Sequence, residues 1–411
     1  MMNILYLGNS LPPKIHSSFA KDCKGRGSLA QHNYERSVMK GLSQQEGICA
    51  KALLVPWVGT YPISYTRLFT HSEDFKLNGM SVHSIGYCNL ALLNSWSRRH
   101  RLVEELLRVF EEFEGDTVHV LLVTYKYDML VALDEAKSRT KKRITQTVNM
   151  IDMPGFEFES RKDISGWRKK KLRKTLQTTM QLTGKSDFLM VMTRHLADLF
   201  DHPIPYVVVE GMVDVEGMDE GNEAQHAQED NRKKVVLYTG TLKKIYGVMN
   251  LVEAFEKANI EDAELWICGS GEAATDITER GKTNPQIKYL GLLSSQESWR
   301  KQREATMLVN PRTSEGEYTK YSFPSKNLEY LLSGRPVIVN RLPGIPDEYD
   351  DYFFYPEDES IDALATCLKI VLSMPESERK NRGEAGRKFI IEKKNAKVQV
   401  GKIIELIRQI Q

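Results

Sequence analysis

Residues 321–338 have the sequence YSFPSKNLEYLLSGRPVI. The order of residue types predicts a loop, a short helix and then a strand. Ser322 can cap the helix, and Pro324 suits its first turn. Gly334 suits the position just after the helix, and Pro336 prevents the helix from continuing. We therefore expect a helix-to-strand unit of an α/β fold here.

The start of this helix could hold an anion. Free backbone amides and the helix dipole favour a phosphate at such a position, and Lys326 could add a positive charge. Glu329 follows Lys326 by three residues and could accept hydrogen bonds from a pair of sugar hydroxyls. The same pattern also fits a capped surface helix with a solvated Glu329.

Short apolar runs alternate with helical patterns along the rest of the chain. In the first half the candidate strands are 3–8, 119–123, 188–192 and 205–209. In the second half they are 235–238, 264–268, 287–290, 307–309 and 336–339. Apolar strands separated by helices predict parallel sheets that are covered on both faces. We expect two doubly wound α/β domains in series.

Length and composition agree with two globular domains. The chain has 411 residues, of which 41% are hydrophobic and 27% charged, and one compact core rarely grows so large. The formal net charge of +2 argues against a dedicated nucleic-acid binder. No stretch approaches the length of about 18 apolar residues that a membrane span needs, and the N-terminus resembles a strand rather than a signal peptide.

The five cysteines are scattered and contain no Cys-x-x-Cys pair. Their odd number and their spacing predict neither a disulfide scaffold nor a cysteine zinc site, and favour a reducing cytoplasm. None of the nine histidines shows metal-ligand spacing either.

An acidic stretch divides the chain. Residues 210–230 contain eight acidic residues and neither Lys nor Arg, a composition typical of a linker or surface loop. We expect an N-terminal domain at 1–210, a linker at 211–232 and a C-terminal domain at 233–395. The segment 396–411 has apolar residues on one helical face and could pack on either domain.

The stretch 321–338 resembles the donor-site segment of GT-B glycosyltransferases of family 4, the glycosyl transferases group 1. Those enzymes usually carry a Glu, seven residues, a second Glu and then a Gly-x-Pro-Val-Ile turn. The second Glu matches Glu329, which the resemblance implies binds the ribose of a nucleotide. The first would fall on Tyr321, so that half of the motif is missing. The resemblance implies two Rossmann-like domains that face a central cleft.

Residues 236–255 resemble the strand, glycine turn and helix at the start of the family's nucleotide-binding domain. Family members commonly place an Arg after the first Gly and a Lys before the second, to grip the diphosphate. Here those positions are Thr241 and Tyr246. Lys243 and Lys244 are the nearest substitutes, although both could be solvated turn residues.

The resemblance thus implies a set of donor-binding residues on two segments of the C-terminal domain. The set comprises Gly240, Thr241, Lys243, Lys244, Ser322, Phe323, Pro324, Ser325, Lys326 and Glu329.

The N-terminal domain gives fewer signals. Gly25, Gly27 and Ser28 lie between the first strand and the first helix, where the family has a glycine-rich loop that faces the cleft. A loop without a ligand fits these residues nearly as well. Asp152 stands where many family members have a His-Asp pair, with Ile151 in place of the His. Asp152 is therefore the candidate catalytic residue.

A basic run extends from Arg161 to Lys174, with eight Lys or Arg residues and one Asp. Such a run can bind anionic lipid, meet RNA or form a solvated helix face. The resemblance implies that the N-terminal domain binds the acceptor and the C-terminal domain the nucleotide sugar. Lipid is therefore favoured over nucleic acid, because the basic run lies in the acceptor domain and an acceptor built on a polyprenyl carrier sits at a membrane.

The resemblance implies a retaining glycosyltransferase that moves a sugar from a nucleotide-diphosphate donor to a glycan or polyprenyl-linked acceptor. The usual role of family members and the basic run favour a function in bacterial surface polysaccharide synthesis, in the cytoplasm or at the inner face of the membrane. The chain contains no Asp-x-Asp pair, so we expect neither a metal nor a cofactor. The alternatives are a nucleotide-sugar epimerase on the same fold and a degenerate, membrane-associated scaffold.

Overall fold

The computed structural model describes residues 1–23, 29–155, 166–213 and 233–409. The chain divides into two compact units. Unit 1 comprises Met1–Met212 and Ala396–Gln411, and unit 2 comprises Val213–Asn395. The C-terminal helix α13 (Ala396–Arg408) therefore belongs to unit 1, which is otherwise formed by the N-terminal part of the chain.

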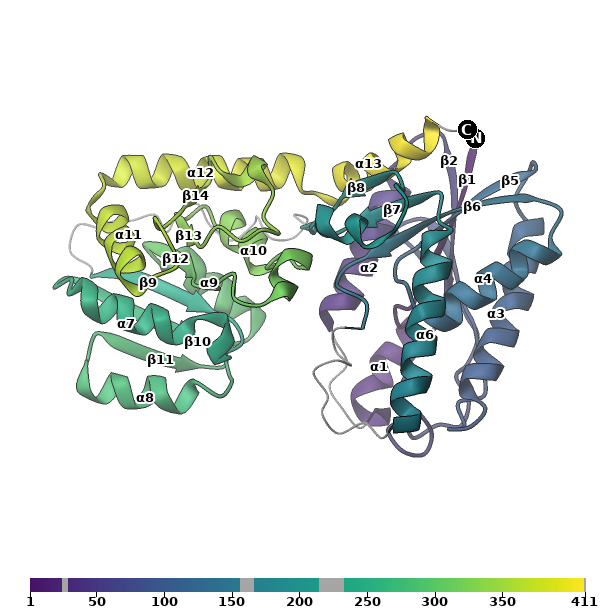
Figure 1. Cartoon of the computed structure of the whole chain (residues 1–411), viewed down its shortest axis with the longest axis horizontal. Helices are drawn as coiled ribbons and strands as arrows, with labels where there is room; N and C mark the ends of the chain where they lie inside the picture. The colour runs from purple at the N-terminus through teal and green to yellow at the C-terminus, as the bar shows by residue number, and fades with distance from the viewer. Residues whose placement is uncertain (24–28, 156–165, 214–232, 410–411) are drawn as a thin grey trace. The chain divides into compact units, whose positions relative to one another are not determined.

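Unit 1 is built on an eight-stranded sheet (Figure 1). Its strands are β1 (Met2–Gly8), β2 (Ile48–Leu54), β3 (Glu73–Leu77), β4 (Met80–Ser84), β5 (Thr117–Leu122), β6 (Arg143–Met150), β7 (Phe188–Val191) and β8 (Tyr206–Val208). They lie in the order β3-β4-β2-β1-β5-β6-β7-β8, and every pair is parallel except β3 with β4. The order reverses between β1 and β5, which is the topological switch point of a doubly wound sheet.

Helices cover both faces of this sheet. They are α1 (Pro13–Asp22), α2 (Leu29–Ser43), α3 (Asn94–Glu111), α4 (Tyr127–Arg139), α6 (Gly166–Gly184) and α13. Right-handed crossovers put α2 on one face and the row α3, α4, α6 on the other, because the connections run in opposite directions along the sheet. On the α2 face, Val400, Ile403 and Ile407 of α13 join Ile4 and Leu121 in one apolar core.

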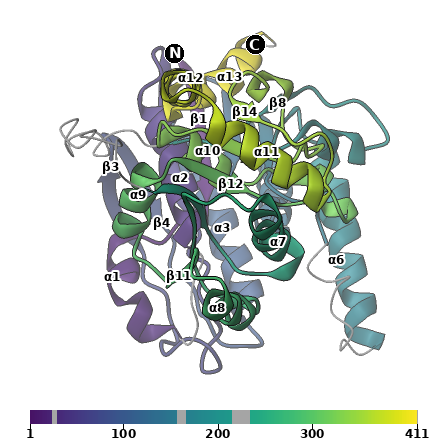
Figure 2. The ribbon, with the colours of Figure 1, turned by 90° about the vertical axis from the view of Figure 1, so that its left-hand side faces the viewer.

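Unit 2 is built on a six-stranded parallel sheet. Its strands are β9 (Lys234–Thr239), β10 (Ala263–Cys268), β11 (Ile287–Gly291), β12 (Met307–Asn310), β13 (Val337–Val339) and β14 (Phe353–Phe354), in the order β11-β10-β9-β12-β13-β14. Its helices are α7 (Val248–Ala258), α8 (Ala274–Thr283), α9 (Ser295–Glu304), α10 (Lys326–Leu332), α11 (Ile361–Ser373) and α12 (Glu376–Lys393). Figure 2 shows α7 and α11 on one side of the sheet and α9 on the other.

The core of unit 2 lies beneath α7 and α11. Leu251 and Phe255 of α7 and Leu368 of α11 pack with Val236 and Ile267 of the sheet. These side chains recur every three or four residues in the helices and every second residue in the strands, because one face of each element points into this core. The opposite face of β9 is buried as well.

The predicted strands coincide with β1, β5 and β7 to β13, whereas β2, β3, β4, β6 and β14 were missed. β6 was missed because its side chains are polar although the strand is central. Thr145 and Thr147 of β6 contact the two ring nitrogens of His119 on β5, at 2.8 and 2.9 Å. Such pairing satisfies polar groups inside a sheet, and a single strand's sequence does not reveal it.

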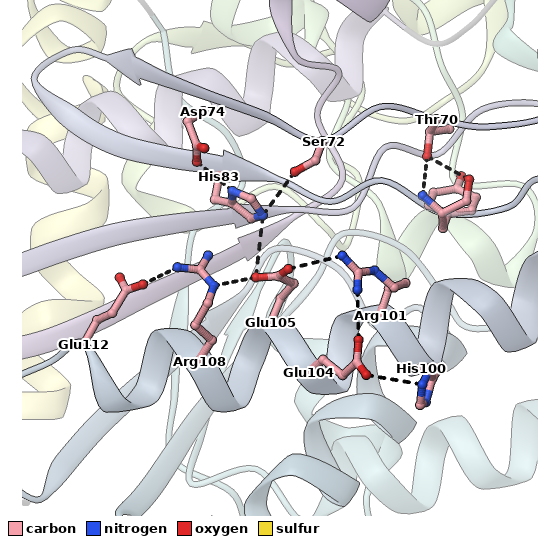
Figure 3. A network of polar contacts seen from close by, with 11 residues as sticks. Thr70, Ser72, Asp74, His83, His100, Arg101, Glu104, Glu105, Arg108 and Glu112 are labelled. Carbon is pink, nitrogen blue, oxygen red and sulfur yellow. Dashed lines mark hydrogen bonds and ion pairs between the residues drawn. The ribbon is translucent and has the colours of Figure 1, made fainter.

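The edge hairpin β3–β4 is held to α3 by a polar network (Figure 3). His83 on β4 contacts Asp74 Oδ1 through Nδ1 at 2.6 Å and lies 3.6 Å from Glu105 Oε2 through Nε2. Arg108 Nε donates to the same Glu105 carboxylate at 2.7 Å. Charged side chains at a sheet edge also discourage pairing with another chain.

The five cysteines are free thiols. Within the described ranges, no helix combines the length and the apolar character that a bilayer-spanning helix requires.

A carboxyl group is buried where β1 ends. Glu35 of α2 accepts hydrogen bonds through Oε2 from the backbone N–H groups of Asn9 and Ser10, at 2.8 and 2.7 Å, and from the Tyr6 hydroxyl at 3.2 Å. Burial raises the pKa of Glu35 to about 7, although the two N–H groups oppose the rise. The group that holds the β1 loop therefore changes charge near neutral pH.

We expect Glu35→Gln to remove a pH dependence of stability. The folded-state pKa lies above the ordinary value of 4.5, so the protonated carboxyl stabilises the fold at low pH and this contribution is lost as the pH rises through about 7. The free energy of unfolding of the wild type should fall by roughly 3 kcal/mol relative to the variant between about pH 4.5 and 7. Urea unfolding at a series of pH values measures it. The exposed Glu46→Gln is the control, and parallel profiles for wild type and Glu35→Gln would contradict the assignment.

Candidate active site

A cavity of about 600 Å³ opens at the carboxyl ends of three neighbouring strands in unit 2. Thr239 ends β9, Cys268 ends β10 and Asn310 ends β12, and all three line the cavity. Residues 323–326, at the start of α10, form a further part of its wall. Ligands of open parallel sheets bind at this edge, so the cavity is the candidate site.

Close backbone contacts shape this cavity. The Gly240 N–H donates to the Cys268 carbonyl oxygen at 3.0 Å, and a Cβ at Gly269 would lie 1.8 Å from the Gly240 carbonyl oxygen. Gly247 has a φ of +73°, and a Cβ there would lie 2.2 Å from the Pro311 carbonyl oxygen. The loops after β9, β10 and β12 therefore pack backbone against backbone, which only glycine permits.

Glu329 is held at the cavity wall by two donors. Gln302 Nε2 donates to Glu329 Oε1 at 2.8 Å, and Lys326 Nζ donates to Oε2 at 2.7 Å. Gln302 lies on α9, is fully buried and also donates to Thr239 Oγ1 at 3.2 Å. The Glu329 side chain keeps 34% of its surface exposed, so its carboxylate is oriented by the protein yet reachable from the cavity.

Tyr330 joins α10 to the end of β9. Its buried hydroxyl accepts a hydrogen bond from the Thr239 N–H at 2.8 Å and donates one to the Thr239 carbonyl oxygen at 2.9 Å. Burial raises the pKa of Tyr330 far above its ordinary value, so the hydroxyl stays neutral and can do both. Glu329 and Lys326 are thereby placed beside the strand ends.

Arg312 is the second residue after the end of β12. It is a cation of the cavity that the sequence analysis missed. Its guanidinium lies over the rings of Tyr246 and Tyr318, at 5.3 and 5.1 Å, and donates to Ser322 Oγ at 3.1 Å. Tyr246 occupies the position where the family commonly has a Lys. The absence of a Lys at position 246 could have indicated that another residue supplies the charge. Arg312 was not found in this way because its loop is distant in the sequence.

Most of the predicted donor-binding residues line the same cavity. They are Gly240, Thr241, Phe323, Pro324, Ser325, Lys326 and Glu329. Lys243 and Lys244 are not among the residues that line it. Lys244 instead forms an ion pair with Asp276 at 2.7 Å, which raises its pKa, and the ammonium of Lys243 lies 5.7 Å from the centre of the Tyr246 ring.

The predicted helix cap is corrected by the structure. α10 begins at Lys326, Ser325 holds the N-cap position without a side-chain hydrogen bond, and Ser322 is extended. Ser322 does not cap the helix because a 3-10 turn at Glu317–Tyr321 precedes it and its hydroxyl binds Arg312. Gly334 follows the helix with a φ of +75°, as predicted for the residue after its end.

The candidates of the N-terminal domain are described only in part. Gly25, Gly27 and Ser28 lie outside the described residues. Asp152 is exposed, follows β6 at the carboxyl edge of the unit 1 sheet, and accepts a hydrogen bond from the Tyr125 hydroxyl.

Residues 233–374 match the family model for glycosyl transferases group 1. The chain also resembles solved GT-B glycosyltransferases. The predicted resemblance and the α/β fold class are thus confirmed. No curated protein matches the chain by sequence.

Three of the similar solved structures cover nearly the whole chain. Sucrose-phosphate synthase from Thermosynechococcus elongatus has a TM-score of 0.61 at 14% identity and covers 99% of this chain and 98% of its own. The lipopolysaccharide outer core galactosyltransferase WaaB has 0.61 at 16%, with 99% of each chain covered. HepE from Anabaena in complex with UDP has 0.62 at 13%, with 100% of each covered.

We expect Gly269→Ala to destabilise unit 2 because the new methyl group would overlap the Gly240 carbonyl. The loss in unfolding free energy should exceed about 1 kcal/mol. Gly291→Ala is the control for a glycine with positive φ in open space, since Gly291 has a φ of +71°, against +141° at Gly269, and nothing within 4 Å of an added Cβ. Urea unfolding of both variants compares the crowded position with the open one. Equal losses in the two variants would show that the contact at Gly269 relaxes freely.

Proposed function

We propose that the chain is a retaining glycosyltransferase that moves a sugar from a nucleoside-diphosphate sugar to a glycan or lipid-linked acceptor. The observation that carries the proposal is the meeting of Arg312, Lys326 and Glu329 in one cavity at the strand ends of unit 2. This cavity lies within the segment 233–374 that matches the glycosyl transferases group 1. UDP in the similar HepE structure supports a nucleotide ligand.

In this proposal the diphosphate lies against Arg312 and Lys326. Negative charge develops on the diphosphate as the sugar departs through an oxocarbenium-like transition state, and cations held in place stabilise that charge without reorganisation. Arg312 is already oriented by Tyr246, Tyr318 and Ser322. The proposal assigns charge neutralisation to these side chains and requires neither a metal nor a cofactor.

Glu329 would bind the ribose. A carboxylate can accept hydrogen bonds from two neighbouring hydroxyls, and Gln302 and Lys326 hold this one by 2.8 and 2.7 Å contacts. When a donor binds, the Lys326 ammonium can contact a phosphate oxygen while Gln302 keeps the carboxylate in place. Glu329 and Lys326 are therefore positioned to contact the ribose and the phosphate, respectively.

We place the acceptor on unit 1, where the exposed Asp152 at the carboxyl edge of the sheet is the candidate to contact it. The name of WaaB, a lipopolysaccharide galactosyltransferase, supports a role in surface polysaccharide synthesis. Such a role places the protein in the cytoplasm at the inner face of the membrane. The exposed basic residues within 168–174 suit that surface, whereas residues 161–165 of the basic run lie outside the described residues.

A panel of nucleotide sugars tests the function directly. A transferase releases the nucleoside diphosphate slowly from one preferred donor without an acceptor, and faster with one. An epimerase changes the sugar while the nucleotide stays attached, and a degenerate scaffold binds no donor. Chromatography of the nucleotide products distinguishes these results, and failure to bind any donor would overturn the proposal.

We expect Arg312→Ala to weaken binding of a nucleoside diphosphate by about 1.5–3 kcal/mol and to leave nucleoside binding unchanged. Lys244→Ala is the matched control, because this lysine is 58% exposed and paired with Asp276. Calorimetric titration with UDP, GDP and the nucleosides measures both. If Lys244→Ala lost the affinity and Arg312→Ala kept it, the diphosphate would lie on the loop after β9 instead.

We expect Glu329→Ala to weaken nucleoside diphosphate binding by about 1–3 kcal/mol. The comparison ligand is the 2′,3′-dideoxy nucleoside diphosphate, which lacks the hydroxyls that the carboxylate would bind. The variant and the wild type should bind this ligand with similar affinity. A loss of equal size for both ligands would assign Glu329 to positioning Lys326 rather than to the ribose.

A further inference from the structure

The carboxyl edge of unit 1 exposes apolar and basic side chains together. We propose that this edge is a docking surface for an anionic lipid bilayer, with an apolar anchor (Ile63, Leu92, Leu93 and Trp96) and a basic anchor (Trp167 to Lys171). The inference rests on the proposed function for its biological role, since it brings a lipid-linked acceptor to the unit that would bind it.

The apolar anchor consists of large side chains that the fold leaves in solvent. Leu92 is 94% exposed, Ile63 70% and Trp96 60%. Single exposed apolar residues are common, but several on adjoining segments mark an interaction site.

The segments that carry the apolar anchor are tied to each other. The Tyr61 N–H donates to the Asn89 carbonyl oxygen at 3.1 Å, and Asn94 Nδ2 donates to Thr60 Oγ1 at 3.3 Å. These bonds join the loop after β2 to the loop after β4 and the first residue of α3. The segments that carry the apolar anchor are therefore held together at one edge of the sheet.

The basic anchor lies at the start of α6. Residues 168–174 include six Lys or Arg, all exposed, and α6 contains no acidic residue. Trp167 beside them is 67% exposed. Cations in the first turns of a helix are disfavoured by the helix dipole, so helix stability does not account for them. An anionic partner does.

Both anchors belong to the same edge. Ser95 Oγ donates to Asp128 Oδ1 at 2.8 Å and Arg98 Nε donates to Asp128 Oδ2 at 3.0 Å, which joins the start of α3 to the first turn of α4. α4 in turn packs against α6. The three helices all follow strands of one parallel sheet, so their starts lie along one edge (Figure 1). Neighbouring helices pack about 8–10 Å apart, and α4 lies between α3 and α6. The two anchors are therefore separated by two helix spacings, or about 20 Å.

A bilayer fits this combination better than a soluble polyanion. Phosphates of RNA would pair with the lysines but offer little to Leu92 or Ile63. A membrane surface takes Leu and Trp side chains into its interfacial layer and holds Lys and Arg at its anionic headgroups. The partner we infer is thus a membrane that contains acidic phospholipid.

Sedimentation of the full chain with sucrose-loaded vesicles tests this surface. The vesicles are phosphatidylcholine alone or an equimolar mixture with phosphatidylglycerol. We expect the wild type to bind the anionic vesicles more tightly than the neutral ones. Lys170→Glu/Lys171→Glu should lower anionic binding by at least about 20-fold. Lys380→Glu/Lys388→Glu on α12, also exposed, should leave it unchanged.

A second pair of variants tests the apolar anchor. Leu92→Glu should lower vesicle binding by at least about tenfold, whereas Ile370→Glu, at a residue of α11 that is 51% exposed, should not. Equal binding of the wild type to both vesicle types would overturn the proposal. So would a Leu92→Glu variant that binds as the wild type does, because cations alone would then suffice and a soluble polyanion would be the better partner.

The nucleotide affinity of each variant separates this inference from the proposed function. Nucleoside diphosphate binding depends on unit 2 and should be unchanged in every vesicle-binding variant, which also shows that unit 2 of each is folded. If nucleotide binds and vesicles do not, the docking surface alone is refuted. If vesicles bind and no nucleotide sugar does, the glycosyltransferase proposal fails and the surface stands.

Discussion

The two hydrogen bonds between the Tyr330 hydroxyl and the Thr239 backbone hold the site of unit 2 together. They join a short helix to the end of a central strand, and the helix carries Lys326 and Glu329. A seven-residue helix has little stability of its own, so its position depends on this contact and on packing. A neutral, buried tyrosine serves here because it donates and accepts through one atom.

Positive charge reaches the cavity from a different segment than the resemblance predicts. Thr241 and Tyr246 leave the loop after β9 without the usual Arg and Lys. Arg312 supplies a cation from the loop after β12, and Tyr246 lies beneath its guanidinium. Tyr246 thus favours a cation at Arg312, since an aromatic ring stabilises a guanidinium that stacks on it.

Unit 1 has both paired buried groups and exposed side chains near the carboxyl edge of its sheet. Two buried charged groups are paired there, since Oε2 of Glu35 binds the β1 loop and Arg98 binds Asp128. The groups left exposed, Leu92 and the lysines of α6 among them, have no such structural partner within the described residues. Large apolar side chains that are exposed on adjoining segments are typical of a surface that binds another molecule.

The sequence by itself determined the parallel α/β architecture and the helix-to-strand unit at 321–338, part of which lines the candidate cavity. It could do so because apolar strands, glycines and prolines act on the local backbone. It did not reveal β6, whose threonines are satisfied by His119 on the neighbouring strand. Nor did it reveal Arg312 or Gln302. Their roles follow from strand order, which brings the ends of β9 and β12 together although about seventy residues separate them along the chain. Only the tertiary structure decides such contacts, because they depend on which distant backbones become neighbours.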